Sequence, residues 1–300
     1  MAKKRDVVIA VIIAVSFVVA IGFFGLIVIG LMSEGPGEGF AGFGEKIGVV
    51  EVFGAIDETN GRRVIAELDR WTDNSSIKAI VLHINSPGGG VAISQEIYDA
   101  ILRVKERKPV VASMASVAAS GGYYVACGAD RIMADPGTIT GSIGVIFQFY
   151  EFEGLMDKVG VALQTVKSGE MKDVGSPDRP LTKKEELMLQ SVVMDSYEQF
   201  VDVVATGRGM EKEEVYPLAD GSIFTGVQAM NLGLVDTLGG LYEAIDLAAD
   251  LAGVRGEPSV VRPYHREKVS IFDFLGSFLG DLHLPLDKKP AGPQLLYLYQ

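Results

Sequence analysis

Three glycine-rich segments of the 300-residue chain carry residue types that can perform acyl-transfer chemistry. The first, NSPGGG at 85–90, follows an apolar stretch and precedes a helical pattern. Consecutive glycines leave backbone N–H groups unobstructed, so the segment can bind a phosphate or stabilise a developing oxyanion. It lacks the Gly-Lys-Ser/Thr sequence of a nucleotide-binding P-loop. A tight turn before a helix would use the same residues, so this segment alone leaves both interpretations open.

The second segment, ASGGYY at 119–124, has Ser120 between small residues at the expected start of a helix. A hydroxyl there is exposed and lies at the positive end of the helix dipole, which stabilises negative charge. The N–H of Gly121 would join that of Gly89 in an oxyanion hole if the two turns lie at the same edge of a parallel sheet. Ser120 is therefore a candidate nucleophile, although a serine that only caps the helix would fit the same position.

A serine nucleophile needs a base, and the third segment, KSGEMKDVGSP at 167–177, offers two lysines. The histidines are poor candidates, because His83 lies in an apolar strand-like stretch and the other two are near the C-terminus. We expect His83 to be a core or sheet-face residue. A lysine can replace histidine when burial and neighbouring groups lower its pKa enough to leave the amine neutral near pH 7. Lys167 and Lys172 are the candidates, and spacing alone does not choose between them.

These segments are embedded in alternating strand and helix patterns. Apolar β-branched runs predict strands, and apolar residues three and four positions apart predict helices. The predicted strands are 47–52, 77–84, 110–114, 132–134, 139–146 and 161–166. The predicted helices are 60–71, 120–127 and a helix in which Ile93, Ile97, Ile101 and Val104 lie on one face. A further helix is predicted at 181–204, with a capping box at Thr182 and Glu185. Such alternation is typical of an α/β protein with a mostly parallel sheet.

The first 32 residues predict a membrane anchor. Basic residues at 3–5 precede an uncharged apolar run at 7–32, which would form about 39 Å of helix at about 1.5 Å per residue. That length is sufficient to cross a bilayer. A removed signal peptide, whose apolar region is shorter, is the alternative. The basic residues favour a cytoplasmic N-terminus, which would put the rest of the chain on the outer face of the plasma membrane.

Composition divides the remainder of the chain and excludes several functions. Residues 33–46 are Gly-rich and predict a flexible linker, 47–262 predict the globular domain, and 263–300 predict a docking tail or a partly disordered end, with docking favoured. The net charge of −12 opposes nucleic-acid binding. A single cysteine excludes a disulfide framework and multi-cysteine zinc sites, and no metal or organic cofactor is indicated.

Taken together, the motifs resemble the signal peptide peptidase A (SppA) family of membrane-anchored serine proteases. The matching segments are NSPGGG at 85–90, ASGGYY at 119–124, TGSIGV at 140–145, KSGEMKDVGSP at 167–177, GRGM at 207–210 and ADGSIFTG at 219–226. The resemblance covers the anchor and residues 47 to about 251. It implies a Clp protease/crotonase-like α/β fold with repeated β-β-α units and a Ser–Lys dyad.

By position, the resemblance makes Ser120 the nucleophile and Lys172, the second of the two lysines, the general base. Ser142 matches the residue that orients the lysine amine, and Gly89 matches an oxyanion-hole donor. Gly121 as the second donor is our geometric inference. The family forms rings, so a homo-oligomer with one dyad per chain is implied. The implied substrates are signal peptides left in the membrane after their cleavage from exported precursors.

Two other functions account for part of the motif set. A related class of Ser–Lys membrane proteases cleaves stomatin-like partners and has similar small-Ser-Gly turns, but it fits the full motif set less well. A non-hydrolytic crotonase relative would use paired glycine turns to hold an acyl-CoA thioester. That function would leave the anchor and Lys172 unexplained.

Overall fold

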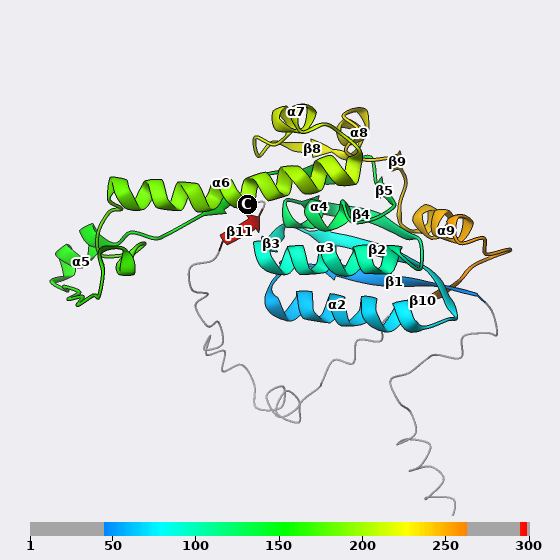
Figure 1. Ribbon diagram of the computed structural model, residues 1–300, viewed down its shortest axis with the longest axis horizontal. Coiled ribbons are helices and arrows are strands. Elements are labelled where there is room, and N and C mark those ends of the chain that lie inside the picture. The colour runs from blue at the N-terminus through cyan, green and yellow to red at the C-terminus, as the bar shows by residue number, and fades with distance from the viewer. Residues whose placement is uncertain (1–44, 263–294, 299–300) are drawn as a thin grey trace, which may run out of the picture. The chain divides into compact units, whose positions relative to one another are not determined.

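The computed structural model describes residues 45–262 and the backbone of 295–298 (Figure 1). These residues belong to one compact unit. Within these ranges, no helix combines the length and the apolar character needed to cross a bilayer. The predicted anchor at 7–32, nearly all of the predicted linker and most of the predicted tail lie outside the described residues.

The centre of the fold is a mostly parallel sheet, as the sequence predicts. Its strand order is β10-β1-β2-β4-β5-β9, with β6 paired to β4 and β8 paired to β6, and β6–β8 is the antiparallel pair. The strands are β1 (Lys46–Phe53), β2 (Ile77–Ser86), β4 (Val110–Ala119), β5 (Arg131–Ala134), β6 (Ile139–Gly141), β8 (Ile223–Thr225), β9 (Thr237–Leu238) and β10 (Ser259–Val261). Strands β1, β2 and β4 are largely buried, because helices cover both faces of the sheet.

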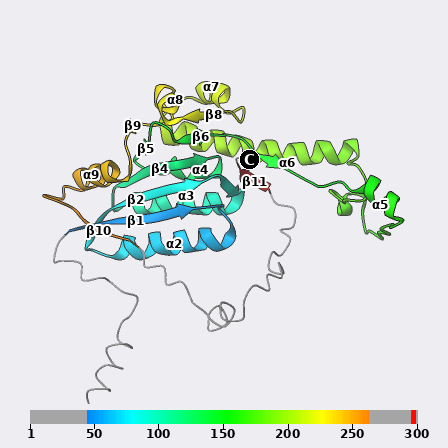
Figure 2. The same cartoon turned by 180° about the vertical axis from the view of Figure 1, so that it is seen from behind.

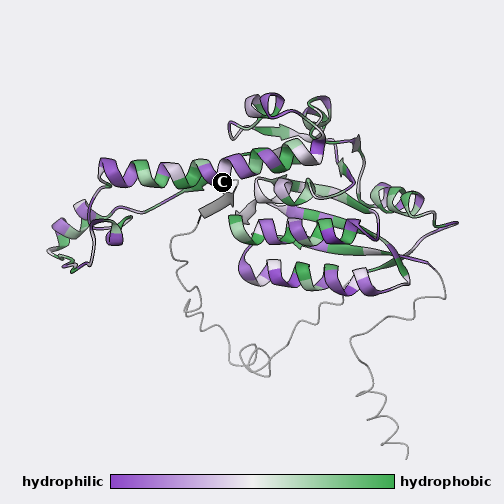
Figure 3. Ribbon diagram, in the orientation of Figure 1, coloured by the Kyte–Doolittle hydropathy of each residue, from purple (hydrophilic) through white to green (hydrophobic). Residues whose placement is uncertain are grey.

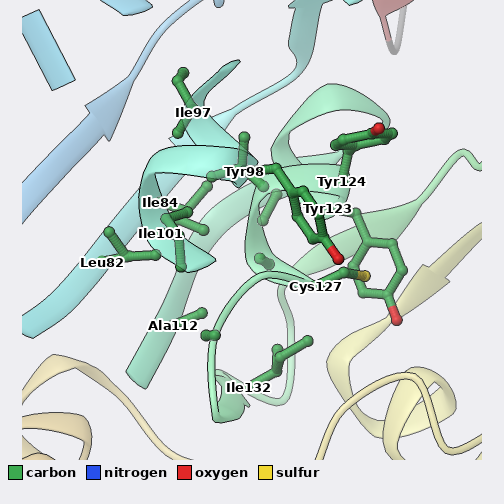
Figure 4. Close-up of a cluster of buried hydrophobic side chains, with 14 of the residues drawn as sticks. Leu82, Ile84, Ile97, Tyr98, Ile101, Ala112, Tyr123, Tyr124, Cys127 and Ile132 are labelled. Atoms are coloured by element: carbon green, nitrogen blue, oxygen red, sulfur yellow. The ribbon is translucent and has the colours of Figure 1, made fainter. Parts of the chain in front are cut away.

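Helices α2 (Glu58–Asp73), α3 (Val91–Lys105) and α4 (Gly121–Ala126) cover one face, and α9 (Leu241–Leu251) covers the other (Figures 1 and 2). Two hydrophobic clusters result, because alternate residues of each strand point to opposite faces. Figure 4 shows part of the larger cluster, in which α3 and α4 pack on β2, β4 and β5. Its labelled members are Leu82, Ile84, Ile97, Tyr98, Ile101, Ala112, Tyr123, Tyr124, Cys127 and Ile132.

A second sheet of three short antiparallel strands lies beside the first. Strand β11 (Leu295–Leu298) pairs with β3 (Gly88–Gly90) on one side and with β7 (Ile146–Phe147) on the other. The remaining elements are α5 (Glu153–Val159), η1 (Glu170–Asp173), α6 (Lys183–Arg208), α7 (Lys212–Val215), η2 (Tyr216–Leu218) and α8 (Gly226–Asn231).

Helix α6 begins at the predicted capping box: the Thr182 hydroxyl and the Glu185 carboxylate each accept a backbone N–H bond from the other residue. The buried side chains in its C-terminal half include Phe200 and Val204, whereas its first half is largely exposed. We call residues 148–195, which include α5, η1 and the first half of α6, the arm. Figure 1 shows this segment extending beyond the sheet, and Figure 3 shows apolar and polar residues interspersed along it.

Two predicted strands are wrong. The run 139–146 is interrupted after Gly141, because Gly141 and Ser142 have φ of +79° and +50°, which turn the chain out of β6. The run 161–166 forms no strand, and all its residues are exposed. Its β-branched residues favour an extended backbone, but no described strand edge pairs with it.

Candidate active site

Ser120 occupies a strained turn between β4 and α4. Its φ of 53° and ψ of −117° lie in a region that costs a non-glycine residue about 1–3 kcal/mol. The turn is held by two backbone bonds: the Ser120 N–H donates to Gly141 O at 2.8 Å, and the Ser120 carbonyl accepts from Tyr124 N at 2.9 Å. No side-chain hydrogen bond from Ser120 caps α4, so the simple helix-cap interpretation is wrong. Strain that the fold maintains in this way is typical of a functional residue.

The two glycine turns lie against each other, as the sequence predicts. Their strands end together, because Ser86 in β2 pairs with Ala118 in β4. A Cβ atom built on Gly121 would lie 3.2 Å from Gly89 N and 2.8 Å from Ser94 Oγ. One built on Gly89 would lie 2.1 Å from the Ile56 carbonyl oxygen. Neither site has room for a side chain, so both positions require glycine, and Gly89, Gly121 and Ser120 are all buried in the single chain.

Ser142 lies next to the nucleophile turn. The β4–β6 register pairs Ala119 with Gly141, so Ser120 and Ser142 each follow a paired residue directly. In the described part of the chain, these two serines are the non-glycine residues with positive φ. The Ser142 N–H donates to Ser222 O at 2.7 Å, which fixes the turn after β6. The role of Ser142 in orienting the lysine amine stays a prediction.

The two candidate lysines have different surroundings. The Lys167 amine donates to Asp173 Oδ1 at 2.6 Å and to Glu170 O at 3.2 Å, so it is engaged in a structural ion pair. Lys172 lies in η1 and is exposed. A desolvated niche around Lys172 is therefore not present in a single chain, because the α5 and η1 segments bury no residue of their own.

The structure does not bring Lys172 to Ser120 within one chain. The turn of Lys172 is tied through Arg179 to Glu185 in the first turn of α6. The contact of α6 with the nucleophile helix lies much farther along, where Phe200 packs on Tyr124 with ring centroids 5.1 Å apart. The two contact points are about 22 Å apart along the helix at about 1.5 Å per residue. Figure 1 shows the arm, with α5 and the first half of α6, extending away from the sheet and α4.

Other titratable groups are not suited to act on Ser120. His83 lies in β2 on the sheet face that α9 covers in part, as the sequence predicts, and its ring packs on Phe53. Burial lowers the pKa of His83, and its Nδ1 atom has no hydrogen-bond partner among the described residues. Burial raises the pKa of the Cys127 thiol to about 12, so it stays protonated and unreactive. The described ranges contain no cluster of three or more side chains that could hold a metal ion.

An extended peptide backbone already lies beside the glycine turn. Strand β11 pairs Leu296 with Gly90, Tyr297 with Gly89 and Leu298 with Gly88, all antiparallel. On its other side, β11 pairs with β7. These four residues of the predicted tail dock by backbone pairing, and the space between β3 and β7 has the width of one β-strand.

Comparison with known proteins identifies the family. The model of peptidase family S49 matches residues 103–255, and that of Clp protease matches residues 45–136. A Synechocystis protein provisionally named as a protease is 47% identical over 210 residues, which are 70% of this chain and 76% of the relative. The chain belongs to peptidase family S49.

Two further relatives agree with this assignment. A Methanocaldococcus jannaschii protein, also provisionally named as a protease, is 34% identical to this S49 peptidase over 307 residues, 95% of this chain and 98% of the relative. An Enterococcus faecium protein provisionally named signal peptide peptidase SppA is 40% identical over 191 residues, 63% of this chain and 56% of the relative. The resemblance to SppA serine proteases is confirmed, and the chain is a serine peptidase with a Clp protease-like α/β domain. Membership in a peptidase family favours peptide hydrolysis over acyl-CoA binding.

Sequence reasoning missed one part of this site. Arg179 bridges Asp173, the neighbour of Lys172, to Glu185. The Thr182–Glu185 capping box was visible in the sequence, but its link to the turn of Lys172 depends on how the arm folds back on α6.

Proposed function

We propose that this S49 peptidase is a membrane-anchored endopeptidase that degrades signal peptides remaining in the membrane after export. Ser120 is the nucleophile and Lys172 is the general base. The observation that carries the proposal is the contact between the strained turn of Ser120 and the glycine strand β3. A nucleophile at a helix N-terminus, packed against the backbone of two glycines, is the arrangement that acyl transfer requires.

The proposed mechanism proceeds through an acyl-enzyme. The neutral Lys172 amine removes the proton of Ser120 Oγ, which attacks the carbonyl carbon of the scissile peptide bond. The N–H groups of Gly89 and Gly121 stabilise the oxyanion, and Lys172 returns the proton to the leaving amine. Water, deprotonated by the same lysine, then hydrolyses the ester and frees Ser120. Ser142 holds the amine in line with the nucleophile.

In this proposal the dyad forms between two copies of the chain. The length of α6 between its two contacts keeps Lys172 from its own Ser120, so a neighbouring copy has to supply the base. The arm also exposes many large apolar side chains, which a second copy would cover. These include Leu155, Val159, Val161, Leu163, Val166, Leu187 and Met194. A ring of copies would give every Ser120 a lysine from its neighbour.

The pairing of β11 supports an extended substrate backbone. A peptide that adds a strand between β3 and β7 gains main-chain hydrogen bonds regardless of its side chains. Such binding suits apolar signal peptides of varied sequence. An anchor at residues 7–32 and a catalytic domain outside the plasma membrane would keep the site near peptides that emerge from the bilayer.

Complementation tests the proposal. Full-length Ser120→Ala and Lys172→Ala chains should each be inactive on apolar peptides, whereas Lys158→Ala, at another exposed lysine of the arm, should remain active. Co-expression of the two inactive chains should restore about a quarter of wild-type activity, because each site draws Ser120 and Lys172 at random from two pools. Full activity of either single variant would overturn the dyad, and a failure to complement would overturn its formation between copies.

Covalent labelling supplies an independent readout. A serine-reactive phosphonate should modify Ser120 in the wild-type enzyme and in Lys158→Ala. Peptide mapping should find no label at Ser120 in Lys172→Ala, because the hydroxyl then lacks its base. Label on another serine would contradict the assignment of the nucleophile.

A further inference from the structure

We propose that Arg179 is a positioning residue that fixes the turn of Lys172 to the start of α6. It does so through Asp173 and Glu185, and the amine of Lys172 thereby reaches the neighbouring copy at a defined place. This inference rests on the proposed function and adds to it a residue that touches neither substrate nor nucleophile.

The turn of Lys172 is weak by itself. Element η1 spans four residues and buries none of them. Its backbone bonds run from Lys172 N to Gly169 O at 3.1 Å and from Val174 N to Met171 O at 3.4 Å, and the second is long. Short 3₁₀ segments have poor hydrogen-bond geometry. Side chains therefore have to supply the rigidity that a general base requires.

Arg179 supplies this rigidity through both terminal nitrogens of its guanidinium group. Nη2 lies 3.0 Å from Asp173 Oδ1 and 2.6 Å from Glu185 Oε1, and Nη1 lies 2.9 Å from Glu185 Oε2. The two bonds to Glu185 form the planar fork that arginine makes and lysine cannot. Asp173 directly follows Lys172, so fixing Asp173 restricts the backbone that carries the amine.

Glu185 anchors the network in α6. It is 1% exposed, and its Oε2 atom accepts from Thr182 N at 2.8 Å and from Thr182 Oγ1 at 3.0 Å. The hydrogen bonds from Arg179, with those from Thr182, lower the pKa of Glu185 to about 2, so the carboxylate stays charged at every working pH. The same residue thus caps the helix and holds Arg179.

The turn is tethered on its other sides as well. The Lys167 amine reaches Asp173 from the chain before η1. After η1, Gly175 lies so close to Phe149 that a Cβ atom would come within 2.1 Å of its ring. The Phe152 N–H donates to Pro177 O at 2.6 Å. Among the described residues, two ion pairs link the turn to α6, Arg179–Glu185 and Lys184–Glu170. The Lys184–Glu170 pair is exposed on both sides and contributes little, whereas Glu185 is buried, so Arg179 is the stronger link.

The network lies outside the two hydrophobic clusters, so its loss should not unfold the sheet. Its role in catalysis can therefore be separated from a role in folding. Two matched variants do this: Arg179→Lys keeps the charge but loses the fork, and Glu185→Gln keeps a capping oxygen but loses the anionic partner. Lys183→Ala removes an exposed ion pair to Glu186 within α6 and serves as the control.

In the full-length enzyme we expect Arg179→Lys and Glu185→Gln to lower kcat about 10-fold to 100-fold with little change in KM, because a displacement of about 1 Å at the chemistry has effects of this size. Thermal unfolding should match wild type, and Lys183→Ala should match wild type in every measurement.

The outcomes separate this inference from the proposed function. If Lys172→Ala abolishes activity while both network variants keep the wild-type kcat, the positioning role is overturned and the dyad stands. If Lys172→Ala is fully active, the dyad itself fails. A rise in KM with an unchanged kcat would also contradict a positioning role. Should one variant unfold, the other decides the matter by the same criteria.

Discussion

Ser120 donates its backbone N–H to the carbonyl oxygen of Gly141 at 2.8 Å, and this bond couples the nucleophile turn to the end of β6. Gly141 has φ of +79°, and a Cβ atom there would lie 2.6 Å from the Phe224 ring. Two strained turns therefore support each other. Because Ser142 directly follows Gly141, the same bond fixes the spacing between the backbones of the two serines.

Gly121→Ala should damage the oxyanion hole. The added Cβ atom would lie 2.8 Å from Ser94 Oγ and 3.2 Å from Gly89 N, so one of the two turns has to move. We expect kcat to fall about 100-fold or more, as it does when one oxyanion donor is lost. Gly137→Ala, where a Cβ atom meets nothing within 4 Å, is the control and should keep wild-type kinetics. Equal activity of the two variants would exclude Gly121 from the site.

Ser142→Gly should separate stability from activity. Glycine adopts the φ of +50° at this position without strain, so the melting temperature should stay level or rise. Activity should fall about ten-fold, because the lost hydroxyl contributes one hydrogen bond worth roughly 1 kcal/mol or slightly more. Peptide hydrolysis and thermal unfolding measured on the same sample test both parts. Unchanged activity would contradict the assigned role of Ser142.

Val166→Asp should disrupt assembly without unfolding the sheet. Val166 is fully exposed on the arm, and a charge there would lie in the proposed contact between copies. We expect smaller particles by light scattering and a parallel loss of activity. The matched control is Tyr242→Asp, which changes another exposed residue outside the arm, on α9, and should retain both properties. A fully active, fully assembled Val166→Asp enzyme would argue against the arm as the interface.

Stability should decline in mildly acidic solution because of His83. Burial lowers the pKa of this imidazole in the folded protein, so the unfolded chain binds the proton more readily. The free energy of unfolding should therefore be unaffected by His83 above about pH 6.5 and should decrease as the pH falls below that unfolded value. Urea titrations at several pH values test this, and His83→Asn should remove most of the slope. Glu51, Asp135 and Arg262 also act on the ring, so their charges have to be kept in the comparison.

Removal of residues 295–300 should ease access of peptides to the site. Strand β11 occupies the backbone edges of β3 and β7 that the proposed substrate would use. We expect the truncated enzyme to show a lower KM for an extended apolar peptide with kcat unchanged. An unchanged KM would mean that substrates bind elsewhere.

The central strands and the helices that pack on them were predictable from sequence, because burial imposes a clear apolar period on them. The end of β6 at Gly141 was not, since serine rarely adopts the positive φ that Ser142 has directly after it. The predicted strand at 161–166 does not form for a different reason. Its β-branched residues favour an extended backbone, but a strand also needs the edge of a neighbouring strand to pair with.

The candidate site also has a part that the sequence predicts and a part that it does not. Ser120, Gly89 and Gly121 follow from strand ends at one sheet edge, a rule that needs only the order of the elements. The link from Arg179 to the turn of Lys172 needs the folded arm, which no local pattern specifies. The distance from Lys172 to Ser120 follows from the length and the packing point of α6, and the sequence reveals only the first of these.

The length of α6 has a consequence for when the enzyme can act. Under the proposed arrangement, a single copy newly inserted into the membrane carries only half of a complete active site and cannot hydrolyse peptides. Hydrolysis then begins only as molecules encounter one another in the plane of the bilayer, so the rate should rise more steeply than linearly with surface density. Expression level by itself would set a threshold for turnover.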